Sequence, residues 1–137
     1  MLKIDKTRRN VAMRRYWGEI KDPIYGYVYV TEAEKEIIDS YPVQRLHRLR
    51  QLAGAEFVYP GATHTRFEHS IGVTYLAGRL SENPNLSQHL SEDEVQTIRI
   101  AALLHDVGHG PFSHIFEHLL TKFLNKTHED ITTWIIQ

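Results

Sequence analysis

Residues 104–114 read LHDVGHGPFSH, and a helix must end inside this stretch. The apolar run IAALL at 100–104 predicts a buried helix, which the glycines and the proline then break. His105 and Asp106 therefore stand at the end of a buried helix, where ionisable side chains need partners. With His69, thirty-six residues earlier, they form a nitrogen and oxygen ligand set suited to Zn, Mn or Fe. This pattern favours a metal site; the alternative is a solvated helix end.

The glycine-rich part of the same stretch carries two more histidines, His109 and His114. Glycines allow backbone to approach a ligand closely, and Pro111 stiffens the turn. The two histidines could face one pocket as cations or proton carriers, for which phosphate oxygens are the natural counterpart. Arg66 shares a helix face with His69, three residues on, which places a phosphate-binding side chain beside a metal ligand. The alternative interpretation is a loop between helices with surface histidines.

The rest of the chain predicts helices around one small β element. Helices are expected from Thr31, over 43–52, over 66–80, from Ser91 to Asp106, over 115–123 and from His128 onward, with a hairpin or strand over 22–30 and connections over 54–65 and 81–90. The sum is an all-α fold with a short N-terminal β-hairpin. The last helix is still apolar at Gln137 and has no end signal, so we expect the N-terminal part of a larger fold.

Composition excludes several classes of function. The formal charge of −1 gives no overall basic field, so nucleic acid is not an expected partner. No apolar run reaches the roughly 18 residues of a membrane span, and no secretory signal begins the chain, so we expect a cytoplasmic protein. The chain has no cysteine, which excludes disulfides, thiolate zinc sites and a cysteine nucleophile. We expect a basic arm over residues 1–19 and one domain over 20–137.

Three separated motifs resemble a known family. RFEHSIGV at 66–73, LHDVGHGPFSH at 104–114 and THE at 127–129 are similar to motifs of the HD-domain metal-dependent phosphohydrolases, within the deoxynucleoside triphosphate triphosphohydrolase branch. The resemblance runs from about Ile20 to the last residue. It implies an all-α HD-domain fold and a divalent metal (Mn, Mg, Fe, Zn or Ni) held by His69, His105 and Asp106.

The resemblance also implies roles for other side chains. The catalytic residues it implies are His109, His128 and Glu129, and the substrate-binding residues are Gln51, Leu52, Arg66 and His114. Arg66 would hold the α-phosphate, while Gln51 and Leu52 would contact the sugar and the base. His128 would be the catalytic acid, with Glu129 beside it. The implied reaction is attack of metal-activated water on the α-phosphorus, which releases nucleoside and triphosphate.

An aspartate of the family's metal site has no match in this sequence. The family completes its metal site with an aspartate on a later helix, and no aspartate here lies at that place. Three interpretations follow: a dNTP triphosphohydrolase, a phosphohydrolase of the same type acting on a nucleoside monophosphate or cyclic nucleotide, or a truncated non-catalytic module that binds metal or nucleotide. The expected partners are a nucleotide, with dNTP first, and further copies of the chain as a homo-oligomer.

Overall fold

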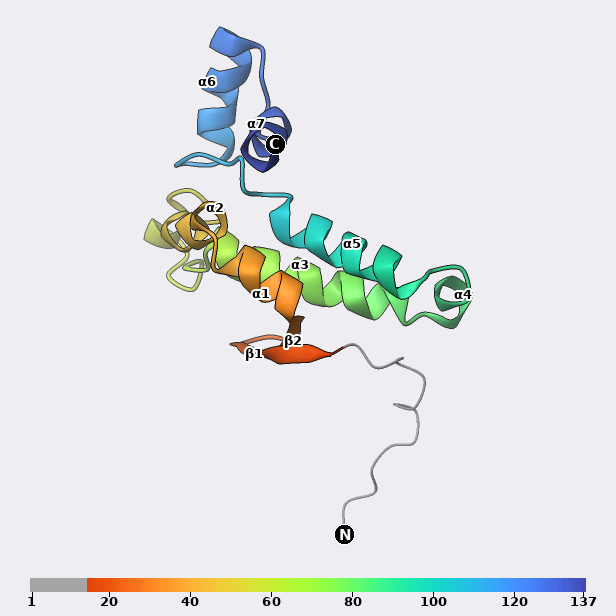
Figure 1. Ribbon diagram of the computed structural model, residues 1–137. Helices are drawn as coiled ribbons and strands as arrows, with labels where there is room; N and C mark the ends of the chain where they lie inside the picture. The colour runs from red at the N-terminus through yellow and green to blue at the C-terminus, as the bar shows by residue number, and fades with distance from the viewer. Residues whose placement is uncertain (1–14) are drawn as a thin grey trace.

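The computed structural model describes residues 15–137, so most of the predicted basic arm lies outside the described part. The elements in chain order are β1 (Tyr16–Asp22), β2 (Gly26–Thr31), α1 (Glu32–Ile38), α2 (Tyr41–Gln44), the 3-10 turns η2 (Arg45–Arg48) and η3 (Ala55–Phe57), α3 (Arg66–Ser81), α4 (Pro84–Ser87), α5 (Glu92–Leu104), α6 (His114–Leu124) and α7 (His128–Ile136). The predicted all-α fold with one N-terminal hairpin is confirmed (Figure 1).

The β-hairpin closes one side of the core. Strands β1 and β2 pair antiparallel, with Asp22 opposite Gly26 at the turn. Asp22 Oδ1 accepts hydrogen bonds of 2.8 Å from two backbone N–H groups of that turn. Val28 and Val30 are each 1% exposed and face inward, as alternate residues of a strand do. Strand β1 begins at Tyr16, inside the segment over 1–19 that the sequence predicts as an arm.

Helices α3 and α5 lie side by side in the middle of the molecule, with the hairpin and α1 against them (Figure 1). The buried core consists of Val28, Val30, Ile38, Val43, Leu46, Leu49, Phe67, Ile71, Leu103 and Val107. A buried ion pair also joins the layers, since Arg99 of α5 donates two hydrogen bonds, of 2.6 and 2.8 Å, to Glu34 of α1. The packed body therefore ends at Val107, immediately after His105 and Asp106.

The predicted helix over 43–52 is wrong. The chain forms one turn of α2 and one 3-10 turn, and Leu49 is already extended. Leu46 and Leu49 are both buried, and their three-residue spacing fits the three residues per turn of a 3-10 helix. Arg50 then forms an isolated antiparallel bridge with Thr65. This pairing ends the helix and brings the following residues to the start of α3.

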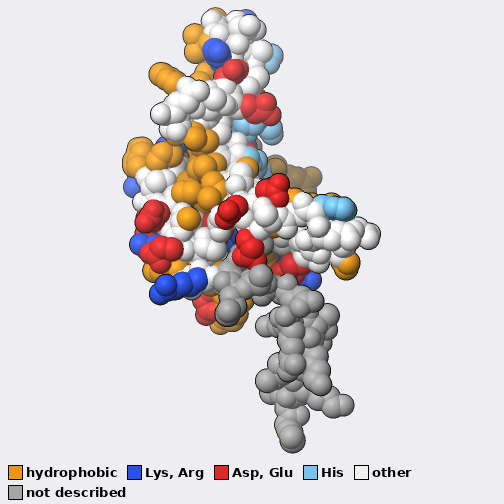
Figure 2. All heavy atoms as spheres, turned by 45° about the vertical axis from the view of Figure 1, so that its right-hand side comes forward, with side chains coloured by type: hydrophobic (Ala, Val, Ile, Leu, Met, Phe, Trp, Pro, Cys, Tyr) orange, Lys and Arg blue, Asp and Glu red, His pale blue; other side chains and the backbone are white. Residues whose placement is uncertain are grey.

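The last two helices stand apart from the body (Figure 1). Helices over 115–123 and from His128 were predicted and are present, but neither α6 nor α7 contains a buried residue. Ile115, Phe123 and Trp134 are 65%, 72% and 76% exposed. Figure 2 shows hydrophobic side chains at the surface of this part of the molecule. Among residues 15–137, no helix has the length and apolar character needed to cross a membrane.

Candidate active site

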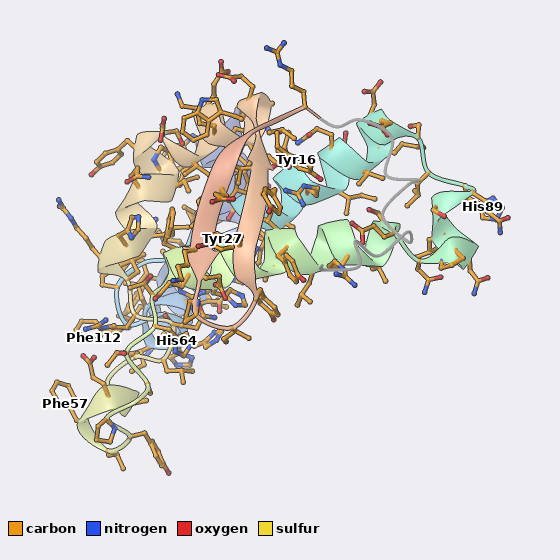
Figure 3. All side chains as sticks on the ribbon, turned by 90° about the horizontal axis from the view of Figure 1, so that it is seen from below. Tyr16, Tyr27, Phe57, His64, His89 and Phe112 are labelled. Carbon is orange, nitrogen blue, oxygen red and sulfur yellow. The ribbon has the colours of Figure 1, made fainter. Side chains whose placement is uncertain are left out.

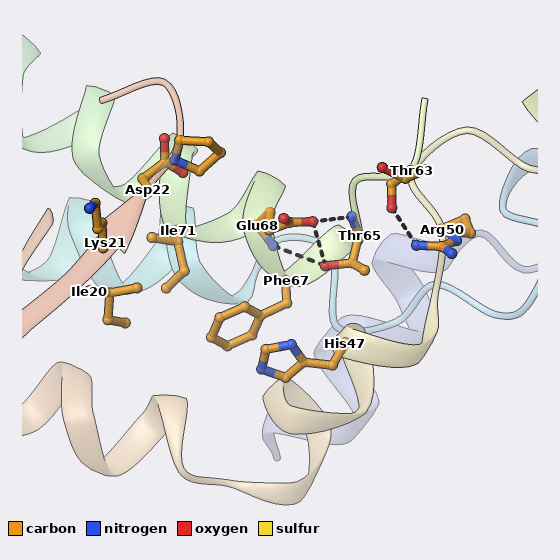
Figure 4. Close-up of a pocket in the computed structure, with 11 residues that line it drawn as sticks. Ile20, Lys21, Asp22, His47, Arg50, Thr63, Thr65, Phe67, Glu68 and Ile71 are labelled. Carbon is orange, nitrogen blue, oxygen red and sulfur yellow. Dashed lines mark hydrogen bonds between the residues drawn. The ribbon is translucent and has the colours of Figure 1, made fainter. Parts of the chain in front are cut away.

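The first turn of α3 carries two of the predicted site residues, Arg66 and His69. A capping box begins this helix: the Thr65 N–H donates to Glu68 Oε2 at 2.5 Å, and the Glu68 N–H donates to Thr65 Oγ1 at 3.3 Å (Figure 4). The cap uses the Glu68 carboxylate, which is exposed. Arg66 and His69 face the end of α5 instead, where His105 lies.

A pocket of about 400 Å³ lies against this turn on the side of the β-hairpin (Figure 4). Lys21, His47, Phe67 and Glu68 are among its lining residues, and the ring of His47 stacks on Phe67 at 3.7 Å between centroids. None of the predicted site residues lines this pocket. It is therefore separate from the cluster of histidines and Asp106.

His69, His105 and Asp106 lie together, as the predicted metal site requires. One ligand atom from each residue lies within 4.8 Å of the other two. His69 Nε2 is 3.8 Å from Asp106 Oδ2, and His105 Nε2 is 3.3 Å from Asp106 Oδ1. The carboxylate thus presents one oxygen toward each imidazole. A donor set of two imidazoles and one carboxylate fits Mn, Fe, Zn and related divalent ions.

Hydrogen bonding and burial prepare both imidazoles for a metal. His105 Nδ1 lies 2.7 Å from the carbonyl oxygen of Ala102. A carbonyl only accepts, so Nδ1 carries the proton and Nε2 keeps a free lone pair. Burial lowers the pKa of His69, although the charge of Asp106 opposes this effect. The lower pKa favours the neutral imidazole, which is the form that binds metal.

Arg66 holds the carboxylate of Asp106 from the buried side. Its Nη1 donates to Asp106 Oδ2 at 2.5 Å, and the two side chains are 2% and 6% exposed. Its Nε donates to Ser113 Oγ at 3.2 Å, and the Ser113 hydroxyl donates to the Arg50 carbonyl at 3.2 Å. Phe112 and Ser113 both have positive φ, a conformation that costs about 1–3 kcal/mol for each such residue. This strained turn delivers the serine hydroxyl to Arg66.

The site contains buried polar atoms with no hydrogen-bond partner. Within the described residues these are Gln51 Oε1, Arg66 Nη2, Ser70 Oγ and His109 Nδ1. Three of the four belong to residues that the sequence predicted as catalytic or substrate-binding. An unpaired buried polar group costs about 1–3 kcal/mol, and native proteins usually satisfy it with water, an ion or a ligand. The residues present therefore fit a charged, oxygen-rich ligand beside the metal ligands.

His109 lies deepest of the histidines that follow Asp106. It is 3% exposed, and its Nε2 is 3.5 Å from Asp106 Oδ1. Burial, together with the charges of Arg66 and His128, lowers the pKa of His109 to about 4. The imidazole is therefore neutral at pH 7 and not a cation. The ring of His128 stacks on it, 3.9 Å between centroids, and Asp106, His109 and His128 form a second group of possible metal ligands.

Glu117, which the sequence analysis did not select, contacts two predicted site residues. His128 Nδ1 lies 2.5 Å from Glu117 Oε1, and His114 Nδ1 lies 3.3 Å from Glu117 Oε2. The hydrogen bond from His128 lowers the pKa of Glu117 to about 2, so its carboxylate is charged. The sequence contains one indication of this contact: His114 and Glu117 are three residues apart on one predicted helix, a spacing at which side chains can interact.

Glu129 does not orient His128. Its side chain is exposed, and among residues 15–137 it makes no hydrogen bond to His128. Adjacent residues of a helix do not face each other, so the carboxylate next in sequence points elsewhere. The partner of His128 comes from the preceding helix, α6.

The remaining predicted residues are Gln51, Leu52 and His114. The backbone N–H of Gln51 donates a hydrogen bond to the His64 carbonyl at 3.1 Å. The carbonyl of the preceding residue, Arg50, accepts a hydrogen bond from the Ser113 hydroxyl, which also contacts Arg66. Leu52 is 48% exposed. The His114 side chain is 80% exposed, with its ring 5.7 Å from that of His109. Figure 3 labels Phe112, which precedes the start of α6 and is 69% exposed.

Comparisons with known proteins identify the family of this chain. The HD domain family profile matches residues 66–136, more than half of the chain, so the chain belongs to the HD-domain family. The protein "Deoxynucleoside triphosphate triphosphohydrolase SAMHD1" of Bos taurus is 48% identical over 101 residues, covering 72% of this chain and 17% of that protein. The "SAMHD1 homolog" of Dictyostelium discoideum is 41% identical over 127 residues, covering 85% of this chain and 25% of that protein.

A solved structure supports the same fold. The crystal structure of a hypothetical protein from Aquifex aeolicus matches with a TM-score of 0.71 and 45% identity, over 86% of this chain and 30% of that one. The resemblance predicted from the three motifs is thereby confirmed. The chain spans a quarter or less of the two curated relatives named above.

Proposed function

We propose that this chain binds a divalent metal through His69, His105 and Asp106 and hydrolyses nucleotides, with dNTPs cleaved to deoxynucleoside and triphosphate. One observation carries the proposal. Arg66 Nη2 and His109 Nδ1, both buried and unpaired, belong to two of the side chains that lie beside Asp106. Donors placed there suit the oxygens of a phosphate. The relatives' printed name, deoxynucleoside triphosphate triphosphohydrolase, supports the choice of substrate.

The proposed metal is one of the divalent ions Mn, Mg, Fe, Zn and Ni, and two imidazoles with one carboxylate suit Mn, Fe, Zn and Ni better than Mg. When bound, such a metal supplies Lewis-acid polarisation of the phosphoryl group and activation of water. The contribution of the protein is to keep the ligands in place. Arg66 fixes Asp106, and the Ala102 carbonyl fixes the ring of His105. These contacts leave one carboxylate oxygen facing each imidazole before a metal arrives.

The substrate would lie against Arg66 and His109. Arg66 Nη2 is available to donate to an α-phosphate oxygen, and His109 Nδ1 can donate to a second oxygen when the single proton of its neutral ring is on Nδ1. Gln51 and Leu52 would contact the sugar and base, and the exposed His114 would contact the outer phosphates. As water bonds to the α-phosphorus and releases a proton to the solvent, the bond from phosphorus to the 5′ oxygen breaks, and that oxygen takes up a proton.

His128 is the proposed source of that proton. Glu117 Oε1 accepts from its Nδ1, which holds the ring and stabilises the protonated imidazole. Glu117 thereby takes the role that the resemblance implied for Glu129. His109, neutral and stacked on His128, keeps a second positive charge out of the site at neutral pH.

The test is an assay of products. The chain is incubated with each dNTP, with and without Mn²⁺ or Mg²⁺, and followed by ³¹P NMR and chromatography. We expect deoxynucleoside and triphosphate, and no activity in Asp106→Asn. Asp93→Asn, an exposed aspartate at the start of α5, is the matched control and should be fully active. Monophosphate with pyrophosphate, or diphosphate with phosphate, contradicts the triphosphohydrolase. Activity only on nucleoside monophosphates or cyclic nucleotides supports the alternative function, a phosphohydrolase of the same type with a different substrate.

A non-catalytic metal-binding or nucleotide-binding module is the second candidate. One observation favours it: among residues 15–137, the group formed by His69, His105 and Asp106 offers three ligand atoms, and no fourth His, Cys, Asp or Glu joins it. Catalytic sites with three protein ligands are known, so the count alone does not decide. A chain that takes up metal and nucleotide but forms no product from any phosphate ester supports this candidate.

We also propose that the chain self-associates, as its sequence predicts. The exposed apolar residues of α6 and α7, among them Ile115, Phe123 and Trp134, support this. Sedimentation over a range of concentrations should show dimers or larger species, and a monomer throughout contradicts it. A nucleotide substrate agrees with the predicted cytoplasmic location.

A further inference from the structure

Thr132 of α7 joins that helix to the turn carrying His105 and Asp106. Its Oγ1 accepts a hydrogen bond from the Gly108 N–H at 2.9 Å and donates one to the His105 carbonyl at 3.3 Å. A single hydroxyl thus satisfies a donor and an acceptor of the turn. Thr132 also lies four residues after His128, on the same face of α7. The face of α7 that contacts the turn is therefore the face that carries His128.

Gly108 allows α7 to come this close. A Cβ at position 108 would lie 2.1 Å from the His128 carbonyl oxygen and 2.4 Å from the Thr132 nitrogen. A Cβ at Gly110 would lie 2.2 Å from the ring of Phe116 in α6. The sequence predicts that these glycines admit a ligand. In the structure, the space beside them holds α6 and α7.

Few other contacts fix this helix pair. Neither α6 nor α7 has a buried residue, so apolar packing contributes little to their placement. His128 nevertheless has a defined position: its ring lies 3.9 Å from that of His109, at 14° between the planes. This parallel stack needs α7 at a fixed distance from the turn. The Thr132 hydroxyl supplies that distance.

We propose that Thr132 is a positioning residue, whose hydroxyl fixes α7 against Gly108 and thereby holds His128 over His109. This part of the proposal rests on the contacts of Thr132 and Gly108, which act together with the hydrogen bonds from His128 to Glu117. The consequence for turnover rests on the proposed function, in which His128 gives a proton to the leaving oxygen. Misplacement of a reacting group by about 1 Å can cost about 10²-fold in rate.

Two variants of the full chain separate the hydroxyl from the shape of the side chain. Thr132→Val keeps the shape and loses both hydrogen bonds, whereas Thr132→Ser keeps both. NMR reports the ring-current shifts of the His109 and His128 imidazole protons, and hydrogen exchange reports protection of the Gly108 amide. We expect Thr132→Val to change the shifts and to lose protection, while Thr132→Ser matches the wild type. In the dNTP assay, Thr132→Val should lower kcat by about 10- to 100-fold with little change in KM.

Several results overturn the proposal. One is a Thr132→Val protein with wild-type imidazole shifts and Gly108 protection; another is a Thr132→Ser protein as impaired as Thr132→Val. If Thr132→Val does not fold, hydrogen exchange in the wild-type protein still tests the proposal. A Gly108 amide that exchanges as fast as an unstructured amide contradicts the hydrogen bond to Thr132. If the wild type hydrolyses no nucleotide, the proposed function fails, and the shifts and exchange rates still test Thr132.

Discussion

The two regions that meet at the candidate active site are built differently. The proposed metal ligands lie where α3 begins and α5 ends against a packed core, and Asp106 and Arg66 are almost fully buried. His128 and Glu117 lie on α6 and α7, which bury no residue. The core therefore holds the proposed metal ligands in place, whereas a few polar contacts place the residues proposed to move a proton. Changes in the two regions should have different effects on stability, metal binding and turnover.

The largest effect is expected for Asp106→Ala in the packed region. The change leaves Arg66 as an unpaired buried charge, so the free energy of unfolding should fall by about 3–5 kcal/mol. Urea denaturation of the metal-free protein at pH 7 measures it. The double variant Arg66→Met with Asp106→Leu should recover most of the lost free energy of unfolding, but it should not bind metal. A loss below about 1 kcal/mol in the single variant contradicts the buried pair.

His128→Gln should lower the turnover rate much more than the stability of the packed core. Loss of a general acid lowers kcat by about 10²- to 10⁴-fold, while the unfolding free energy should fall by only about 0.5–1.5 kcal/mol, the usual cost of one lost hydrogen bond, here the one to Glu117. His118→Gln is the matched control, because His118 is an exposed histidine of α6 outside the site. Steady-state kinetics and urea denaturation report the two quantities. Equal losses of kcat in both variants contradict the assigned role.

A pair of apolar truncations measures the contrast in packing. Leu103→Ala, at a side chain with 0% exposure in α5, should cost about 2–5 kcal/mol of stability. Phe123→Ala, at a side chain with 72% exposure in α6, should cost about 0.5 kcal/mol or less in the monomer. Thermal and urea unfolding at low protein concentration give both values. A Phe123→Ala cost equal to that of Leu103→Ala shows that α6 is packed after all.

The smallest effect concerns pH and Glu117. The hydrogen bond from His128 lowers the pKa of Glu117 from 4.5 to about 2. Between these values the unfolded chain binds a proton that the folded chain does not, so stability from this contact is complete above pH 4.5 and is lost as the pH falls toward 2. NMR titration of the Glu117 carboxyl group measures its pKa. In His128→Gln the pKa should move back toward 4.5.

The parts of the fold that depend on local patterns were predictable. Thr31 with Glu34 and Ser91 with Glu94 predicted capping boxes, and both are present at the starts of α1 and α5. The failure over 43–52 has a physical reason. A three-residue apolar spacing fits a 3-10 turn as well as one face of an α-helix, and the pairing of Arg50 with Thr65 is a contact that local spacing does not encode.

The candidate site divides in the same way. His69, His105 and Asp106 were selected as a possible ligand set from their types and their place at the end of a helix, and they do lie together. The carboxylate beside His128 was assigned to Glu129, its neighbour in sequence, but Glu117 makes the contact. That contact depends on how α6 and α7 pack against each other, which neither sequence motif contains.

Metal uptake by three proteins tests the central claim most directly. The wild type, Asp106→Ala and His128→Gln are purified, stripped of metal, titrated with Mn²⁺ by calorimetry and analysed for bound metal. The account predicts that the wild type and His128→Gln each bind Mn²⁺ with similar affinity, and that Asp106→Ala binds none. A wild type that takes up no metal, or a His128→Gln protein that loses it as Asp106→Ala does, contradicts a metal site prepared by the core alone.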